Sequence, residues 1–370
     1  MEMVRKDALS AVAGQKERGA KVIGCFPLYP PVELLAAMDL LPVVLWGLKG
    51  SVENLAESDK HVQAYACAIG RELMQFALSE NHTVLDGIFS YNACDTLRNF
   101  PEIISAANAE AGREIPMLRM HVPQVNPDQT DSTSYLKKEI ARLIEAVENA
   151  YGVHFSPEKF FRATEAYARV RALCRKAEKL VAQGVLSFGM FCRMVLFAYF
   201  QPVAEQIQYL ESMVDGAEMT PDESKTGVVI SGIMPPPTAV VAAMEAAGLR
   251  VVANDIACLS RCYGYSPPPM EDPGAFYADF FTNRPACTTL LYQSDTRVEA
   301  FLQMVAHSGA RGVIFSGQKF CEYEYFEFPY LEKRLKDMGV SVLFLEFGVD
   351  DEENVDAYAT RVEAFAEMLD

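Results

Sequence analysis

Three cysteines with similar surroundings are the residues best suited to metal chemistry in this chain of 370 residues. Cys94 follows an apolar run within Leu85–Asn99 (LDGIFSYNACDTLRN) and precedes a helix-like pattern. Cys321 follows a second apolar run, Gly312–Ser316, and Cys67 lies in an Ala-Tyr-Ala-Cys sequence. Thiolates are soft ligands that suit iron and iron–sulfur clusters. We therefore expect Cys67, Cys94 and Cys321 to meet in space and to hold an iron–sulfur cluster.

The other cysteines have a simpler interpretation. The chain contains nine cysteines, an odd number, and no CxxC pair, so a disulfide framework is not expected. Cys174, Cys192 and Cys287 are expected to be small buried apolar residues. Because burial is the commonest role of a cysteine, the sequence positions alone give weak support for a cluster. Cys258 and Cys262, in a polar stretch after a predicted strand, are candidates for a further ligand.

Composition narrows the class of protein. Half of the residues are apolar and 22% are charged, as in ordinary globular proteins. The net charge of −17 disfavours binding to nucleic acid or to anionic membranes, and a polyanionic ligand would need a local basic pocket or one from a partner. No apolar run is long enough to span a membrane, and the N-terminal stretch has no signal-peptide core. The sequence thus predicts a cytoplasmic protein.

Strands and helices alternate at both ends of the chain. The first predicted strands are Lys21–Cys25, Leu41–Trp46, Asp86–Ser90 and Pro116–Val122, and the predicted helices between them include Val32–Asp39 and Asp59–Leu78, with Cys67 in the first half of the latter. The later strands are Thr226–Ser231, Arg250–Asn254, Gly312–Ser316 and Ser341–Leu345, with helices at Thr238–Ala247, Arg297–His307, Leu331–Met338 and Val355–Leu369. The intervening stretch has helical periodicity.

These patterns predict an α/β fold with two doubly wound parallel-sheet domains that face a cleft. We expect an N-terminal α/β domain over 1–130, a helical segment over 131–222 and a C-terminal α/β domain over 223–370. Ligands of open parallel sheets gather at the carboxyl ends of the strands. Cys94 and Cys321 are both predicted at such ends, on opposite rims of the cleft.

Other chemistry has few candidates. The sequence contains no GxxxxGK[ST], GxGxxG, GxSxG or HExxH motif. Asp255 could line the cleft, although an ion pair with Arg261 that orders a loop is the favoured interpretation. Glu322 and Glu324, beside Cys321, could act as a base, and exposed loop carboxylates are the simpler alternative.

Several short motifs, in order, resemble the 2-hydroxyacyl-CoA dehydratase family, which also contains benzoyl-CoA reductase subunits. The matching pieces are Gly24–Pro27 with Pro31, Glu33-Leu34, Leu41-Pro42, Trp46-Gly47, Tyr65–Cys67, Cys94–Leu97, Gly248–Asp255 with Arg261, and Gly312–Phe315 with Lys319–Cys321 and Pro329. The resemblance covers nearly the whole chain. The chain departs from the pattern at Pro30, where many relatives have Cys, at Asp39, where Gly is expected, and in the additional Cys258 and Cys262.

The resemblance implies one [4Fe–4S] cluster, with Cys67, Cys94 and Cys321 at the ligand positions. It implies a subunit of an (R)-2-hydroxyacyl-CoA dehydratase, a hydro-lyase that removes water from an acyl-CoA through a ketyl radical. The radical is started by one low-potential electron from an ATP-dependent iron–sulfur activator protein. The Gly24–Pro27 motif and the chain length resemble the smaller β subunit, which pairs with a homologous α-type subunit and would carry a relay cluster.

Three alternatives stay open at this stage. The chain could be a subunit of a benzoyl-CoA reductase-type enzyme, a cluster-carrying electron-transfer protein without its own substrate, or a two-lobed small-molecule binder without metal. The sequence does not determine the acyl group, the choice between α and β roles, or the ligand of the fourth iron.

Overall fold

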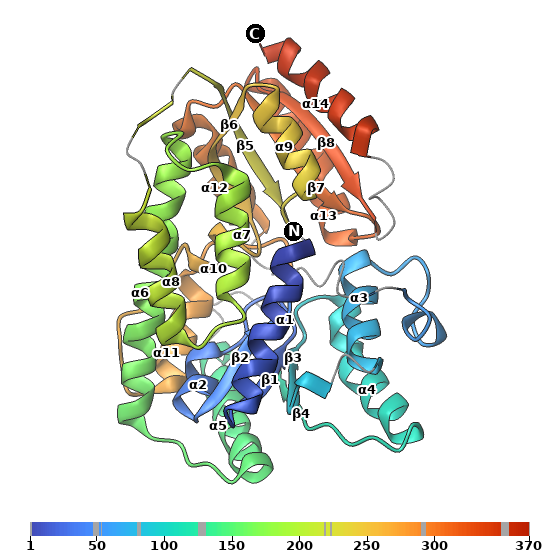
Figure 1. Cartoon of the computed structure of the whole chain (residues 1–370), viewed down its shortest axis with the longest axis vertical. Helices are drawn as coiled ribbons and strands as arrows, with labels where there is room; N and C mark the ends of the chain where they lie inside the picture. Colours follow the sequence, from blue (N-terminus) through green and yellow to red (C-terminus); the bar gives the residue numbers. More distant parts are fainter. Residues whose placement is uncertain are drawn as a thin grey trace.

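Two parallel sheets of four strands each form the framework of the protein (Figure 1). The structure, a computed structural model, describes residues 2–46, 52, 54–79, 83–124, 131–217, 220–222, 224–289, 294–348 and 355–369. Gly47, part of one of the matched motifs, lies outside these ranges.

The two sheets have the same topology. The N-terminal sheet runs in the order β2 (Leu40–Val44), β1 (Lys21–Cys25), β3 (Gly87–Tyr91) and β4 (Met117–Met120). The C-terminal sheet runs in the order β6 (Leu249–Ile256), β5 (Thr226–Gly232), β7 (Gly312–Gln318) and β8 (Ser341–Phe347). In each sheet the first strand along the chain pairs with the second on one side and with the third on the other. The direction of winding therefore reverses between β1 and β3 and between β5 and β7.

Helices connect the strands and fill the middle of the chain. Those of the N-terminal part are α1 (Glu2–Glu17), α2 (Val32–Ala37), α3 (Ala68–Leu78) and α4 (Asp95–Glu110). Those of the middle are α5 (Ser132–Tyr151), α6 (Pro157–Ala182), α7 (Phe188–Ala198) and α8 (Val203–Asp215). The remaining ones are α9 (Thr238–Ala246), α10 (Ser260–Tyr263), α11 (Pro273–Asn283), α12 (Ser294–Ser308), α13 (Glu322–Asp337) and α14 (Val355–Leu369). In Figure 1 the two sheets lie one above the other, with α6, α7 and α8 along one side.

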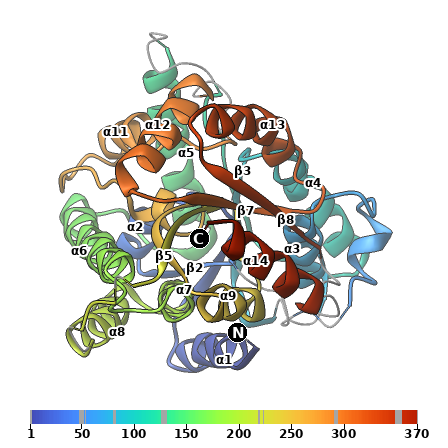
Figure 2. The ribbon, with the colours of Figure 1, turned by 90° about the horizontal axis from the view of Figure 1, so that it is seen from above.

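The core extends through both sheets. One set of contacting buried apolar side chains includes Ile23 and Phe89 of the N-terminal sheet and Val228 and Ile314 of the C-terminal sheet. A second set lies between α12, α13 and the C-terminal sheet, which Figure 2 shows from above, and it includes Phe301. The predicted α/β fold with parallel strands is confirmed, and the division at 130 and 222 stays a prediction. Among the helices in the described ranges, none is both long and apolar enough to cross a membrane.

Two predicted helices have different bounds in the structure. The expected helix Asp59–Leu78 is wrong in its first half, where a single 3₁₀ turn (Ser58–Lys60) is followed by irregular chain up to Cys67. The helix expected at Leu331–Met338 begins nine residues earlier, at Glu322, and continues through Pro329. Both differences concern the starts of helices that follow a candidate cysteine, so both change how the site is built.

Candidate functional site

The three predicted cysteines line one cavity of about 260 Å³. Cys67 and Cys94 come from the N-terminal part of the chain and Cys321 comes from the C-terminal part. Each of the three residues is partly buried. The structure therefore brings together the residues that the sequence singled out.

The cavity lies where strands of both sheets end. Cys94 follows β3 and Cys321 follows β7, as predicted. Leu28, which follows β1, and Ile233, which follows β5, line the same cavity. The ends of the two central strands of each sheet thus border it, at the points where the winding direction reverses and where parallel sheets bind ligands.

Each of the three cysteines is the residue immediately before a helix. Cys67 precedes α3, and its thiol accepts a hydrogen bond from the Gly70 amide at 3.4 Å. Cys94 precedes α4, and its thiol accepts one from the Leu97 amide at 3.4 Å. Cys321 precedes α13 without such a bond. Three helix N-termini, with their partial positive charge, therefore point to one cavity, which stabilises negative charge there.

Burial keeps these thiols protonated when no cation is present. It raises the pKa of Cys67 to about 11 and that of Cys94 to about 12, and it also raises the pKa of Cys321. The negative charges of Glu324 and of the neighbouring thiolates act in the same direction. A bound cation would reverse this balance, because metal binding releases the protons of its thiol ligands.

The remaining lining is mostly apolar. Within the part of the chain that the structure describes, the carboxylates of Asp95 and Glu322 line the cavity and no lysine, arginine or histidine does. Trp46 also lines it and is 1% exposed, and its indole N–H has no acceptor within the described residues. Nothing in the sequence singled out Trp46 beyond its place in a matched motif. Because Trp46 lines the cavity, its N–H is available to an acceptor bound there.

The two glutamates beside Cys321 have different environments. Glu322 is exposed and lines the cavity. The simpler alternative to a catalytic base, an exposed carboxylate, agrees with this exposure. For Glu324 that alternative is wrong, because its carboxylate is buried and accepts hydrogen bonds from the amides of Ile233 and Gln318 at 2.9 and 2.8 Å. Burial raises the pKa of Glu324 to about 7. Glu324 thus holds the ends of β5 and β7 together beneath the cavity.

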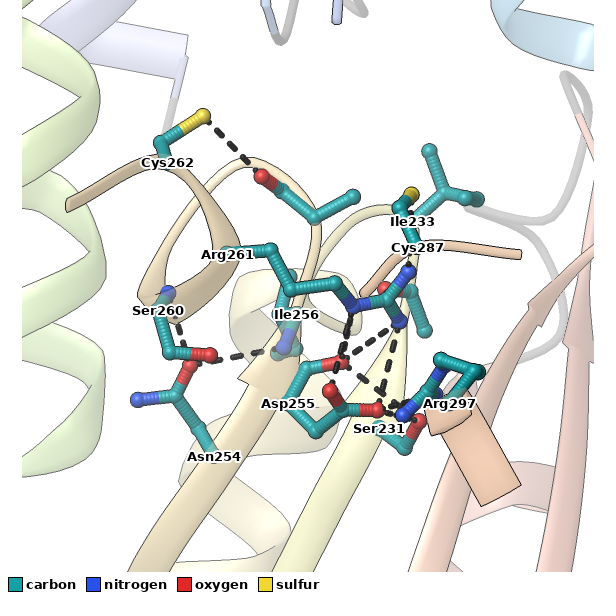
Figure 3. A network of polar contacts seen from close by, with 12 residues as sticks. Ser231, Ile233, Asn254, Asp255, Ile256, Ser260, Arg261, Cys262, Cys287 and Arg297 are labelled. Atoms are coloured by element: carbon teal, nitrogen blue, oxygen red, sulfur yellow. Dashed lines mark hydrogen bonds and ion pairs between the residues drawn. The ribbon is translucent and has the colours of Figure 1, made fainter. Parts of the chain in front are cut away.

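Asp255 belongs to a buried ionic network (Figure 3). Its carboxylate accepts hydrogen bonds from Arg261 at 3.2 Å and from Ser231 at 2.7 Å, and it also pairs with Arg297. Asp255, Arg261 and Arg297 are each at most 3% exposed. The favoured interpretation, an Asp255–Arg261 ion pair that orders the loop, agrees with these contacts. Asp255 is not among the residues that line the cavity.

Cys287 contacts this network, although the sequence suggested only a buried apolar role. It is 1% exposed, and Arg261 donates a hydrogen bond to its sulfur at 3.3 Å (Figure 3). Burial raises the pKa of this thiol, but Arg261 and Arg284 outweigh that effect and lower it to about 6.

The two additional cysteines lie elsewhere. Cys258 is fully buried, and Cys262 donates a hydrogen bond to the Ala257 carbonyl at 3.0 Å. Neither is among the residues that line the cavity of Cys67, Cys94 and Cys321.

The three thiols are spread around the cavity. Within the ranges that the structure describes, no three His, Cys, Asp or Glu side chains are close enough together to bind a single metal ion. A cluster of several irons takes each thiolate on a different iron, so it requires ligands around its perimeter.

Comparisons with known proteins agree with one another. The chain is 27% identical to the (R)-phenyllactyl-CoA dehydratase beta subunit of Clostridium sporogenes over 363 residues, which cover 96% of this chain and 93% of the relative. It is 27% identical to the beta subunit of the (R)-2-hydroxyglutaryl-CoA dehydratase of Acidaminococcus fermentans over 367 residues, covering 97% and 95%. It is 24% identical to one of the subunits of the benzoyl-CoA reductase of Thauera aromatica over 340 residues, covering 88% and 85%. The family model for the 2-hydroxyglutaryl-CoA dehydratase D-component matches residues 27–369, and the chain belongs to this family.

Proposed function

We propose that this chain is the β-type iron–sulfur subunit of a heteromeric (R)-2-hydroxyacyl-CoA dehydratase, a hydro-lyase. In this proposal Cys67, Cys94 and Cys321 hold one [4Fe–4S] cluster, between two doubly wound domains that face each other across the cavity. The observation that carries it is the common cavity of three cysteines, each at a helix N-terminus. The relatives named as dehydratase beta subunits support the choice of subunit and of reaction class.

The residues of the cavity fit such a group. Three thiols around an apolar space provide ligands, helix N-termini stabilise the negative charge of the thiolates, and the Trp46 N–H is a donor for sulfur. When bound, a [4Fe–4S] cluster accepts and donates single electrons, and an iron without a protein ligand can act as a Lewis acid. The described lining is apolar and carries carboxylates but no basic side chain, so it disfavours an added electron. A low reduction potential, which this electron transfer requires, is the result.

The overall reaction converts a 2-hydroxyacyl-CoA into a 2-enoyl-CoA and water. One electron enters the thioester carbonyl, the ketyl radical anion expels hydroxide, a β-proton is removed, and the electron is returned. No net oxidation occurs, so one electron serves many turnovers. In this proposal a separate activator protein supplies the electron at the expense of ATP, and the lack of a GxxxxGK[ST] motif in the sequence is consistent with that division.

The charge of the cavity favours a relay role over direct substrate binding. Coenzyme A carries several phosphates, and basic side chains usually balance that many negative charges. Among the described residues, the cavity lining contains Asp95 and Glu322 but no basic side chain. We therefore propose that the acyl-CoA is bound mainly by the α-type companion chain. A benzoyl-CoA reductase-type role is the second candidate, because one relative carries that name.

Anaerobic purification tests the proposal. We expect a brown protein with about four irons and four acid-labile sulfides per chain, and less than about a quarter of that iron after Cys67→Ser, Cys94→Ser or Cys321→Ser. The matched control is Cys262→Ser, which keeps the hydrogen bond to Ala257 and should retain the iron. An iron-free wild-type protein would contradict the proposal. Assays of 2-hydroxyacyl-CoA and benzoyl-CoA with the companion chain, activator, ATP and reductant separate the two reactions.

A further inference from the structure

A second, larger hollow adjoins the cavity of the three cysteines. It has a volume of about 540 Å³ and shares the side chains of Asp95, Glu322 and Tyr323 with the first cavity. Beyond these shared residues it is bordered by α12 and α13, through Asp295, Phe326 and other side chains. We call this hollow the aromatic–acidic groove.

Aromatic side chains make up one part of the groove. Tyr323, Phe326 and Tyr330 lie on one face of α13, at spacings of three and four residues. Phe326 is 81% exposed and Tyr330 is 52% exposed. Monomeric proteins rarely expose several large rings side by side, and such patches commonly mark protein–protein interfaces.

Two more exposed rings lie at the mouth of the cysteine cavity. Tyr65 is 70% exposed, and Phe320 is 46% exposed directly before Cys321. Phe320 has a φ of 64°, a left-handed conformation that is unfavourable for a bulky residue. With Phe320 in this conformation, Cys321 lines the cavity and the Phe320 ring is exposed. Backbone strain of this kind is typical of functional sites.

Carboxylates make up the other part of the groove. Asp95, Asp295, Glu322 and Glu327 line it, and none of the described lysine, arginine or histidine residues does. Within the described residues Asp95 pairs with the exposed Arg98 and Glu327 pairs with the buried Arg297. No ion pair is present for Asp295 or Glu322 in the same ranges. At the end of the groove, Arg334 of α13 donates a hydrogen bond to the Tyr330 hydroxyl at 3.0 Å and pairs with Glu299.

The acidic and aromatic lining of the groove indicates which kind of chemical group binds there. Unpaired carboxylates next to exposed rings attract a guanidinium or ammonium group, through both charge and cation–π contact. The same carboxylates repel the phosphates of coenzyme A. Brief redox encounters use small contacts, whereas long-lived subunit interfaces bury many large apolar side chains. Several exposed rings therefore favour a permanent partner.

We propose that the aromatic–acidic groove is the docking surface for the α-type companion chain, which inserts an arginine or lysine side chain into it. This inference rests on the proposed function and adds to it the place and the chemistry of assembly. The interface would cover the mouth of the cysteine cavity, so that electrons pass between the two chains over a short distance and away from water.

Assembly measurements on groove variants test this docking surface. The companion is a second chain of the same family from the same organism, co-expressed and purified anaerobically with this chain. We expect Phe326→Ala and Asp295→Lys each to weaken the complex about tenfold or more. Asp295→Asn should weaken it less and should also reduce its dependence on salt concentration. The matched controls are Tyr135→Ala, an exposed ring outside the groove, and Glu363→Lys, an exposed carboxylate on α14.

The outcomes distinguish this inference from the proposed function. Phe326 and Asp295 do not line the cysteine cavity, so iron content should be unchanged in both variants. Groove variants that hold the companion as tightly as wild type, or a wild-type chain that forms no complex with it, would overturn the docking surface even when iron is present. Variants that lose acyl-CoA binding but not the companion would identify a ligand site and overturn it too. An iron-free chain whose assembly with the companion still depends on Phe326 would contradict the proposed cluster but not the docking surface.

Discussion

At the residue scale, charge compensation explains which polar side chains are structural. Asp255 lies between two buried arginines, Arg261 and Arg297, and outside the cysteine cavity. Its carboxylate offsets positive charge that would otherwise be buried without a partner. A candidate base should instead reach the cavity, as the exposed Glu322 does.

Asp255→Asn should therefore act on stability. Removal of one partner from a buried ionic network typically costs about 3–5 kcal/mol, because the remaining charges stay buried. We expect a loss of that size in the free energy of unfolding, measured by urea denaturation of the anaerobic protein. Asp215→Asn, which breaks the exposed pair with Lys176, is the control and should change stability by less than about 1 kcal/mol. An Asp255→Asn protein of wild-type stability but without dehydratase activity would instead favour a catalytic role.

At the element scale, the sequence predicted the strands well because their buried runs are continuous. All eight strands occur where the apolar runs are, and Cys94 and Cys321 follow β3 and β7 as expected. The start of α3 was not predicted, because Ser58–Ala66 has a composition that a helix would also accept. In the structure the Cys67 thiol caps the Gly70 amide, and the helix begins there.

The meeting of the three cysteines could not be derived from their spacing. Cys67 and Cys321 are far apart in sequence, and only the strand order and the relative position of the sheets bring them to one cavity. The strand pattern placed Cys94 and Cys321 at the ends of strands but did not place Cys67 near them. The resemblance to a family supported Cys67 as the third ligand. Trp46, Tyr65 and Phe320 lie within matched motifs, but the sequence did not indicate their places at the cavity, because exposure and partners depend on the fold.

Glu178 joins three elements and gives a pH-dependent prediction. It lies on α6, accepts a hydrogen bond from Asn254 of β6 and is close to Tyr263 of α10. Burial raises its pKa from 4.5 to about 7. Between these two values the folded protein keeps a proton that the unfolded chain has lost, so the free energy of unfolding falls as pH rises.

We expect wild-type stability to fall by about 1–3 kcal/mol from pH 5 to pH 8 relative to Glu178→Gln, whose side chain stays neutral. Urea denaturation at each pH measures the difference. Glu165→Gln, an exposed position on the same helix, is the control and should follow wild type. Parallel curves for wild type and Glu178→Gln would mean that Glu178 titrates normally.

At the scale of the whole molecule, the proposed cluster would link the two ends of the chain. Cys67 and Cys94 belong to the part that contains the N-terminal sheet, and Cys321 follows a strand of the C-terminal sheet. The cavity is bordered by the ends of strands from both sheets, and the Glu324 contacts with the Ile233 and Gln318 amides lie within the C-terminal part alone. A group bound by all three thiolates would add a connection that the unfolded chain cannot make.

Removal of the iron should therefore destabilise the whole molecule. We expect anaerobic chelation to lower the unfolding temperature of the loaded protein by about 5 °C or more, because a ligand that binds only the folded state stabilises it. Differential scanning calorimetry under anaerobic conditions measures the shift. Cys321→Ser should unfold near the chelated wild type and should not respond to chelator, since it has already lost the link between the two sheets. Cys262→Ser should behave as wild type before and after chelation. A loaded protein that unfolds at the same temperature as its chelated form would show that the apolar core shared by the two sheets holds them together without the cluster.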